Sequence, residues 1–213
     1  MRALILVDLQ NDFLPTGALP VPRGDEVIPV ADRLLAKFDL VVATQDWHPP
    51  THGSFASNQP GHKPGELIDL HGLTQVLWPE HCVQGTPGAE FVKGIDTRRI
   101  TKVFQKGTDP TVDSYSGFFD NGHRKATGMG AYLKEKGVDE VFVLGLATDY
   151  CVKFTALDAV SLGLKTHVIE DACRGVNLKP GDVNRALEEM KQAGVWITHS
   201  TVTRPLDLFT RQK

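Results

Sequence analysis

The sequence predicts a three-layer α/β/α protein built on a doubly wound, six-stranded and mostly parallel sheet. Short apolar segments rich in valine, isoleucine and leucine recur along the chain without the polar alternation of a half-exposed strand. Such segments are typical of parallel strands that are covered on both faces. Segments with an apolar stripe at helical spacing lie between several of them, and this alternation favours one layered domain with right-handed crossovers.

The expected elements run in the order strand, helix, strand, long loop, and then strands that alternate with helices. Six segments are expected to be strands: 3–8, 40–44, 102–105, 140–146, 166–170 and 195–198. Four segments are expected to be helices: 25–38, 127–137, 149–163 and 181–194. The last three end on Gly137, Gly163 and Gly194, because glycine suits the left-handed position after a helix.

Length and composition indicate one domain over residues 1–213 and exclude several classes of protein. A net charge of −3 provides no electrostatic footprint for a nucleic acid or an anionic membrane. No uncharged apolar run approaches the roughly 18 residues of a membrane span, and the first apolar segment is too short for a signal peptide. The cysteines are odd in number and form no C-x-x-C pair: Cys82, Cys151 and Cys173. We therefore expect a cytoplasmic protein without a disulfide framework.

The segment at about 45–98, between the second and third expected strands, is unusually long for a connection in a compact domain. Loops beyond about 15 residues are uncommon there and usually carry function. This segment contains five of the eight histidines of the chain and many prolines. We therefore expect it to be a functional insertion.

Polar residues follow the ends of four expected strands. Asp8 ends the first strand, Asp46 follows the second, Lys106 follows the third, and Cys151 follows the fourth after a short turn. Ligands of open parallel sheets bind beyond the carboxyl ends of the strands, near the point where strand order reverses. The four side chains are therefore expected at one edge of the sheet.

Cys151, Asp8 and Lys106 suggest a hydrolase with a cysteine nucleophile. Taken alone, Cys151 fits a small buried apolar residue better than a nucleophile, and Asp8 and Lys106 at the same edge reverse that preference. A position near a helix N-terminus would lower the pKa of its thiol below the ordinary value of about 8.5. The amides of Ala147 and Cys151 could hold an oxyanion. Asp8 would accept the thiol proton and deliver it to a leaving amine, while Lys106 would stabilise the thiolate and hold Asp8 in place.

The segment "QDWHPPTHGSF" contains candidate ligands for a metal ion. Asp46 and His48 are two residues apart directly after a strand, and His81 is the candidate third ligand, with His52 as a further candidate. One carboxylate and two imidazoles suit zinc, iron or manganese. The alternative is a proline-rich loop with solvated histidines.

Six segments of the chain resemble the motif set of the nicotinamidases and pyrazinamidases, the metal-dependent branch of the isochorismatase-like cysteine hydrolases. They are "VDLQNDF" 7–13, "DWH" 46–48, "WPEHCVQGTPGAEF" 78–91, "FQKG" 104–107, "YSGFFD" 115–120 and "GLATDYCVKFTALDA" 145–159. The resemblance extends from residue 2 to about residue 195 and keeps the order of the family's motifs.

The resemblance implies an isochorismatase-like fold and an amidohydrolase that acts on a linear amide bond. The implied reaction is hydrolysis of nicotinamide to nicotinate and ammonia in NAD salvage, with pyrazinamide as a second substrate, through an acyl-thioester. A divalent ion, expected to be zinc with iron or manganese as alternatives, would position the pyridine ring. The implied partner is this small-molecule substrate, and a homodimer is the candidate assembly.

The resemblance also assigns residues to roles. The implied catalytic triad is Asp8, Lys106 and Cys151. The implied metal ligands are Asp46, His48 and His81, and His52 matches a histidine that binds metal only in some members. The implied oxyanion hole is formed by Ala147 and Cys151, and the Leu146–Ala147 bond matches a cis peptide. The implied aromatic pocket is lined by Phe13, Trp78 and Tyr115.

Four other functions compete with this one. An amidase for carbamoyl or ureido compounds would keep the cysteine but needs no metal set. A hydrolase in which the metal activates water would keep most of its rate in Cys151→Ala. A binding module on the same fold would bind metal without turning over any amide. A vinyl ether hydrolase of the isochorismate type is disfavoured because its chemistry needs no thiol.

Overall fold

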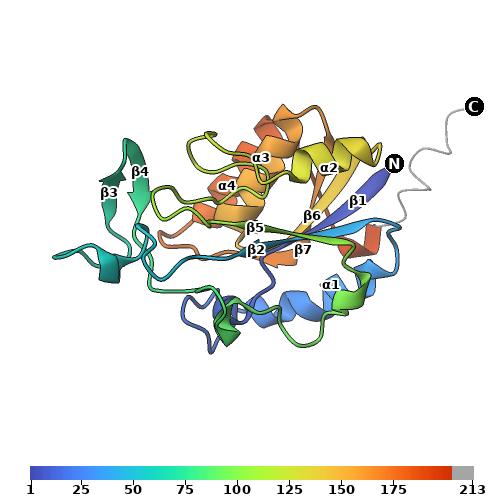
Figure 1. Cartoon of the computed structure of the whole chain (residues 1–213). Helices are drawn as coiled ribbons and strands as arrows, with labels where there is room; N and C mark the ends of the chain where they lie inside the picture. The colour runs from blue at the N-terminus through green and yellow to red at the C-terminus, as the bar shows by residue number, and fades with distance from the viewer. Residues whose placement is uncertain (203–213) are drawn as a thin grey trace, which may run out of the picture.

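The computed structural model describes residues 1–202 and has the predicted three-layer architecture around one parallel sheet (Figure 1). The sheet has the strand order β5-β2-β1-β6-β7-β8, and every neighbouring pair is parallel. Its strands are β1 (Arg2–Val7), β2 (Val41–Asp46), β5 (Lys102–Lys106), β6 (Glu140–Leu146), β7 (Lys165–Arg174) and β8 (Trp196–Thr198). The fold class and the six strands predicted from the sequence are therefore confirmed. The last part of the predicted 1–213 domain, residues 203–213, lies outside the described residues.

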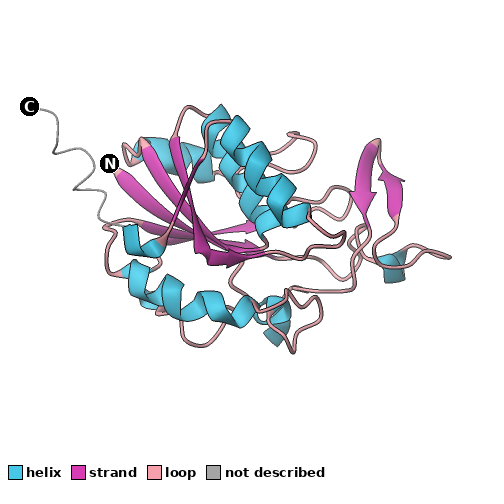
Figure 2. Ribbon diagram, turned by 180° about the vertical axis from the view of Figure 1, so that it is seen from behind, coloured by secondary structure: helices cyan, strands magenta, loops and turns pink. Residues whose placement is uncertain are grey.

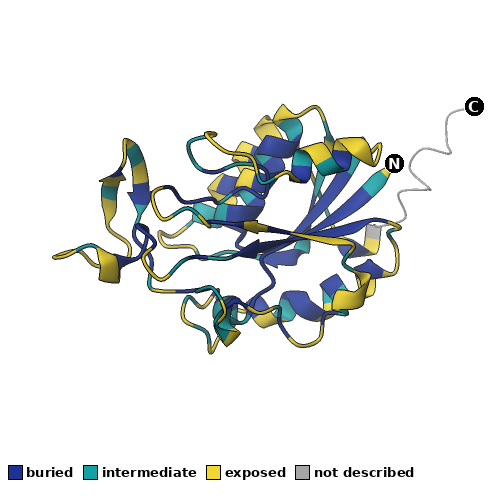
Figure 3. Ribbon diagram, in the orientation of Figure 1, coloured by how far each residue is buried: buried dark blue, intermediate teal, exposed yellow. Residues whose placement is uncertain are grey.

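The central strands owe their unbroken apolar sequences to cover on both faces of the sheet. Every residue of β2 is buried, and β1 is buried from its second residue onward. Figure 3 shows this buried centre between exposed outer layers. The edge strand β5 is covered on one face only: Phe104 and Lys106 are buried, whereas Val103 and Gln105 on the opposite face are exposed.

Helices cover the two faces of the sheet (Figure 2). They are α1 (Ile28–Leu35), α2 (Met129–Glu135), α3 (Lys153–Ser161) and α4 (Asp182–Gln192). The apolar stripe of α1 is buried, as its spacing predicted. The predicted segment 25–38 is helical in two parts, since a 3₁₀ turn at Gly24–Val27 precedes α1. The glycines at 137, 163 and 194 all have positive φ angles, which confirms their place after a helix.

The long segment between β2 and β5 is not the uninterrupted loop that the sequence analysis expected. It contains an antiparallel hairpin, β3 (Leu67–Leu70) and β4 (Leu73–Val76), which projects beyond the sheet (Figure 1). The hairpin turns at His71 and Gly72, which both have positive φ angles, as a tight two-residue turn requires. The prediction missed it because each strand is only four residues long and has a single buried residue.

The part of this segment that follows the hairpin returns to the end of β2. The amide of His48 donates to the carbonyl of Cys82 (3.0 Å), and the amide of Gln84 donates to the carbonyl of His48 (2.9 Å). This short parallel pairing places His81 beside the carboxyl end of the sheet. Across residues 1–202, no helix has the length and apolar character that crossing a membrane requires.

Candidate active site

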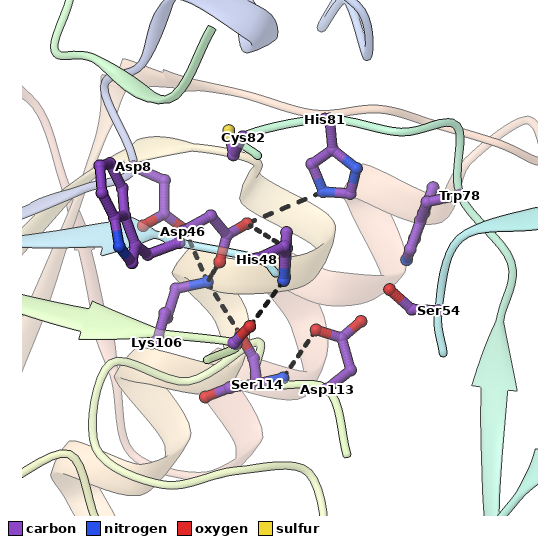
Figure 4. Close-up of polar contacts among 12 residues, drawn as sticks. Asp8, Asp46, His48, Ser54, Trp78, His81, Cys82, Lys106, Asp113 and Ser114 are labelled. Carbon is purple, nitrogen blue, oxygen red and sulfur yellow. Dashed lines mark hydrogen bonds and ion pairs between the residues drawn. The ribbon is translucent and has the colours of Figure 1, made fainter. Parts of the chain in front are cut away.

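The carboxyl ends of β1, β2, β5 and β6 bring the predicted polar residues together. Asp46 and Lys106 are register partners at the ends of β2 and β5, and Asp8 follows β1 directly. Cys151 lies on a single π-helical turn, Thr148–Val152, between β6 and α3. Figure 4 shows Lys106 pointing toward Asp46 and Asp8, so the expected convergence is present.

Lys106 connects the residues of this site. Its fully buried ammonium lies 2.9 Å from Asp8 Oδ2 and 2.5 Å from Asp46 Oδ1. It also donates to the carbonyl of Ser114 (2.9 Å) and approaches Cys151 Sγ at 3.4 Å. One cation thus contacts the thiol and two carboxylates at once.

Burial and charge set the protonation of this group. Burial by itself lowers the pKa of Lys106, but the carboxylates of Asp46 and Asp8 outweigh it and raise the pKa well above its ordinary value. Burial raises the pKa of Asp8 to about 6, although Lys106 and the hydroxyl of Thr44 oppose the change. A carboxylate with a pKa near neutrality is suited to both accept and return a proton.

The thiol of Cys151 differs from the sequence-based expectation. A pKa below the ordinary value was expected from its place near a helix N-terminus. Burial instead raises the pKa of Cys151 well above its ordinary value, and the opposing effect of Lys106 does not compensate. The resting cysteine is therefore a neutral thiol, which needs a base in contact with it.

Asp46, His48 and His81 form a cluster that fits a metal ion. One donor atom from each lies within 4.8 Å of the others. Asp46 Oδ2 is 3.6 Å from Nε2 of His48 and 3.9 Å from Nε2 of His81 (Figure 4). The Nδ1 atoms of the two rings face the carbonyls of Gly107 (2.9 Å) and Pro79 (2.8 Å). Such outer contacts are typical of metal-binding histidines, because they fix the ring and its tautomer.

His52 does not belong to this cluster. It groups instead with His48 and Asp113, and its Nδ1 atom accepts a hydrogen bond from the amide of Ser54 (3.2 Å). The Ser54 hydroxyl lies closer, 2.7 Å from the same Nδ1 atom, and the buried Nε2 atom has no hydrogen-bond partner among the described residues. His52 therefore stays a prediction as a fourth ligand, next to the cluster and not within it.

A narrow cavity joins the thiol to the metal cluster. Its lining contains the predicted aromatic residues and both predicted oxyanion residues: Phe13, Trp78, Tyr115, Ala147 and Cys151. The remaining lining residues are Leu19, Asp46, His48, His81, Asp113, Tyr150 and Val176. The Leu146–Ala147 peptide beside it is cis, as the resemblance implied.

Four lining residues were missed by the sequence analysis: Leu19, Asp113, Tyr150 and Val176. Tyr150 could have been found, because it directly precedes the proposed nucleophile. Val176 follows the carboxyl end of β7, so the rule that located Asp8 would also have pointed to it. Leu19 and Asp113 lie on irregular segments that carry no comparable signal.

Comparison with known proteins agrees with the fold. The isochorismatase domain model matches residues 2–202. A nicotinamidase from Escherichia coli is 53% identical over 197 residues, which cover 91% of this chain and 92% of the relative. The structure of a nicotinamidase/pyrazinamidase from Acinetobacter baumanii superimposes with a TM-score of 0.91 at 48% identity, over 94% of this chain and 96% of that one.

A third relative carries a metal ion. The structure of a pyrazinamidase from Pyrococcus horikoshii in complex with zinc has a TM-score of 0.76 at 42% identity, over 93% of this chain and 98% of that one. Fold and site thus define a class of hydrolases with a three-layer α/β/α fold and a buried thiol beside a carboxylate and a lysine. The chain belongs to the isochorismatase domain family.

Proposed function

We propose that this protein is a nicotinamidase, which hydrolyses nicotinamide to nicotinate and ammonia and accepts pyrazinamide as a second substrate. The observation that carries the proposal is the cavity in which the Cys151 thiol, paired with Lys106 and Asp8, faces Asp46, His48 and His81. The high identity to the Escherichia coli nicotinamidase supports this substrate class.

In the first half-reaction, Cys151 Sγ attacks the carboxamide carbon and its proton passes to Asp8. The developing oxyanion is held by the backbone amides of Ala147 and Cys151. Lys106 stays protonated throughout, because two carboxylates surround it, and it stabilises charge on sulfur. Asp8 then donates its proton to the departing nitrogen, which leaves as ammonia when the C–N bond breaks and a thioester forms.

In the second half-reaction, Asp8 is again ionised and takes a proton from a water molecule. The hydroxide attacks the thioester carbon, the C–S bond breaks, and Cys151 regains a proton from Asp8. The acid is released and the resting site is restored. The neutral resting thiol and the Asp8 pKa of about 6 support a mechanism in which the same carboxyl group accepts and returns a proton in each half-reaction.

Asp46, His48 and His81 would hold one divalent ion, with zinc as the first choice because a relative binds it. Such an ion supplies a Lewis acid for the ring nitrogen of the substrate and withdraws electrons from the ring. Burial and the charge of His48 lower the pKa of His81 to about 4, so its imidazole is neutral and ready to bind a metal. Phe13 and Trp78, which line the same cavity, would hold the flat ring in place.

The test is release of ammonia from nicotinamide and pyrazinamide, measured by a coupled assay with metal analysis of the purified protein. The wild-type enzyme should turn over both amides and lose activity with a chelator. Cys151→Ala should be inactive, whereas Cys173→Ala, a buried cysteine of β7 outside the cavity, should stay active. Retention of most of the rate in Cys151→Ala would indicate water activated by the metal, and metal binding without any turnover would indicate a binding module.

We place the reaction in NAD salvage, since it would recycle the pyridine ring of NAD. A homodimer remains a prediction, and so does the cytoplasmic location expected from the cysteine content. Size-exclusion chromatography with light scattering tests the oligomeric state.

A further inference from the structure

Asp149 connects the turn that carries the nucleophile to a loop that also lines the cavity. Its side chain is 5% exposed and has no role in the mechanism above. Oδ1 accepts the amide hydrogen of Val176 (2.9 Å) and Oδ2 accepts that of Asn177 (2.7 Å). Asp149 belongs to the same π-helical turn as Cys151, so this carboxylate joins the loop directly to the catalytic turn.

The loop held by Asp149 forms part of the cavity wall. Val176 lines the cavity together with Cys151 and Leu19, whereas Asn177 is exposed. The loop follows β7 and leads into α4, without regular structure of its own. The position of Val176 therefore depends on contacts made by the loop and not on a strand or a helix.

The conformation of this loop leaves little freedom around the carboxylate. A Cβ atom at Gly175 would lie 2.2 Å from Val183 Cγ2 and 3.0 Å from Asp149 Oδ1, so only glycine fits between them. Asn177 has a φ angle of 57°, in the left-handed region. This backbone turns two successive amides toward one carboxylate, which is the favourable arrangement for a charged acceptor.

We propose that Asp149 is a positioning residue that holds Val176 as the wall limiting the size of the aromatic ring accepted beside Cys151. The proposal rests on the proposed function, because it concerns the substrate range of that same site. Without the carboxylate, the amides of Val176 and Asn177 would lose their acceptor and the wall would move outward. The effect is on which amides fit and how tightly, not on the chemistry at the thiol.

Two variants and one matched control test the proposal. Asp149→Asn keeps the shape of the side chain but turns one acceptor into a donor, and Val176→Ala removes part of the wall without touching the carboxylate. The control is Asp182→Ala: Asp182 Oδ2 accepts the amide hydrogen of Lys179 (2.7 Å) in the same connection, but Asp182 does not line the catalytic cavity. This variant shows how kinetics change when the connection between β7 and α4 is loosened without any change to the cavity wall.

The substrates are nicotinamide and a series of methylnicotinamides with the methyl group on each free ring carbon in turn. Asp149→Asn and Val176→Ala should raise KM for nicotinamide more than they change kcat. Both should also raise kcat/KM for at least one methylnicotinamide relative to nicotinamide, by about tenfold, the effect of one methyl-sized group in an apolar pocket. Asp182→Ala should leave this ratio unchanged.

Alkylation of Cys151 gives a second readout that needs no amide turnover. The rates for iodoacetamide and for its bulkier N-phenyl derivative are measured by peptide mass spectrometry at Cys151. Both variants should raise the ratio of the bulky to the small reagent by about tenfold, on the same pocket-size argument. If the wild-type enzyme hydrolyses no amide, the proposed function fails, while these ratios still decide the role of the wall.

The proposal is overturned if Asp149→Asn lowers kcat equally on every amide with unchanged ratios, because the residue would then act on the nucleophile's turn. It is also overturned if the variant only lowers the melting temperature, which would make the contact purely structural. Should Asp149→Asn not fold, unchanged ratios in Val176→Ala overturn the assignment of the wall.

Discussion

At the scale of single residues, the site depends on one buried cation shared by two carboxylates and a thiol. Taking a lysine out of water is unfavourable, and so is taking two carboxylates out of water. Lys106, Asp8 and Asp46 offset each other's burial, because each charge has an opposite neighbour within 3 Å. The contacts that prepare the chemistry are therefore also contacts that permit these charges to be buried.

Replacement of Lys106 by methionine should destabilise the protein strongly as well as abolish activity. The substitution leaves Asp8 and Asp46 buried without their cation, and breaking a buried pair in this way costs about 3–5 kcal/mol. Urea unfolding measures the loss. The matched control is Lys102→Met at the exposed start of the same strand, where the ammonium only lies over Phe104 and Tyr132, and the expected change is about 1 kcal/mol or less. Equal effects in the two variants would contradict this account of the charged cluster.

The dependence of kcat/KM on pH should report the ionisation of Asp8. The carboxyl must be ionised to accept the thiol proton, and its pKa is raised to about 6. As the pH falls through this value, Asp8 binds a proton and kcat/KM should fall, by about tenfold for each pH unit below it. Metal content and circular dichroism, measured at each pH, separate this effect from loss of metal or unfolding. A rate that stays constant well below pH 6 in the folded, metal-loaded enzyme would exclude Asp8 as the base.

At the scale of elements, the site is assembled by strand ends and by one returning loop. The β2 strand delivers Asp46 and continues to His48, while the backbone of residues 82–84 pairs with His48 and brings in His81. The Asp12 carboxylate holds this returning loop by accepting the amide hydrogen of Cys82 (2.7 Å). The metal cluster therefore needs the long segment to be folded, although its ligands are close to the sheet.

His81 and His52 should contribute differently to metal binding. His81→Ala removes an expected ligand and should weaken zinc binding by at least about 100-fold, whereas His52→Ala alters only the surroundings and should weaken it by about tenfold or less. Competition with a chromophoric chelator measures both affinities on the metal-free protein. Equal losses in the two variants would make His52 a fourth ligand, although it groups with His48 and Asp113 and not with the whole cluster.

At the scale of the whole molecule, the site lies where the direction of strand addition reverses. From β1 the chain first adds β2 and β5 on one side, and it then returns to add β6, β7 and β8 on the other. The connections after β1 and β6 must therefore leave the sheet toward opposite layers, which opens a crevice between Asp8 and Cys151. The substrate cavity is a consequence of this topology.

Metal binding should stabilise the whole fold. An ion that binds only the folded chain shifts the unfolding equilibrium, by about 2.7 kcal/mol at a free concentration 100 times the dissociation constant. Thermal unfolding of metal-free protein during a zinc titration should show a rising melting temperature, and Asp46→Ala should show little change. A melting temperature that is independent of zinc in the wild-type protein would indicate that no such site forms.

The sequence by itself determined the layered fold, the six strands of the sheet and the residues at the ends of β1, β2, β5 and β6. These were predictable because apolar runs and helical stripes are local patterns, and because parallel topology sends strand ends to one edge whatever the side chains are. The family resemblance then supplied roles that no local pattern contains, such as the assignment of Phe13 and Trp78 to the aromatic pocket.

Only the tertiary structure decided the rest of the site. The pKa of the Cys151 thiol was expected to be low, but burial raises it, and burial depends on everything packed around the side chain. His52 groups with His48 and Asp113 and not with Asp46 and His81, and the wall at Val176 is held by a carboxylate far away in the sequence. Burial, the grouping of side chains and loop position are set by contacts between distant segments, so the order of residues along the chain does not contain them until the chain has folded.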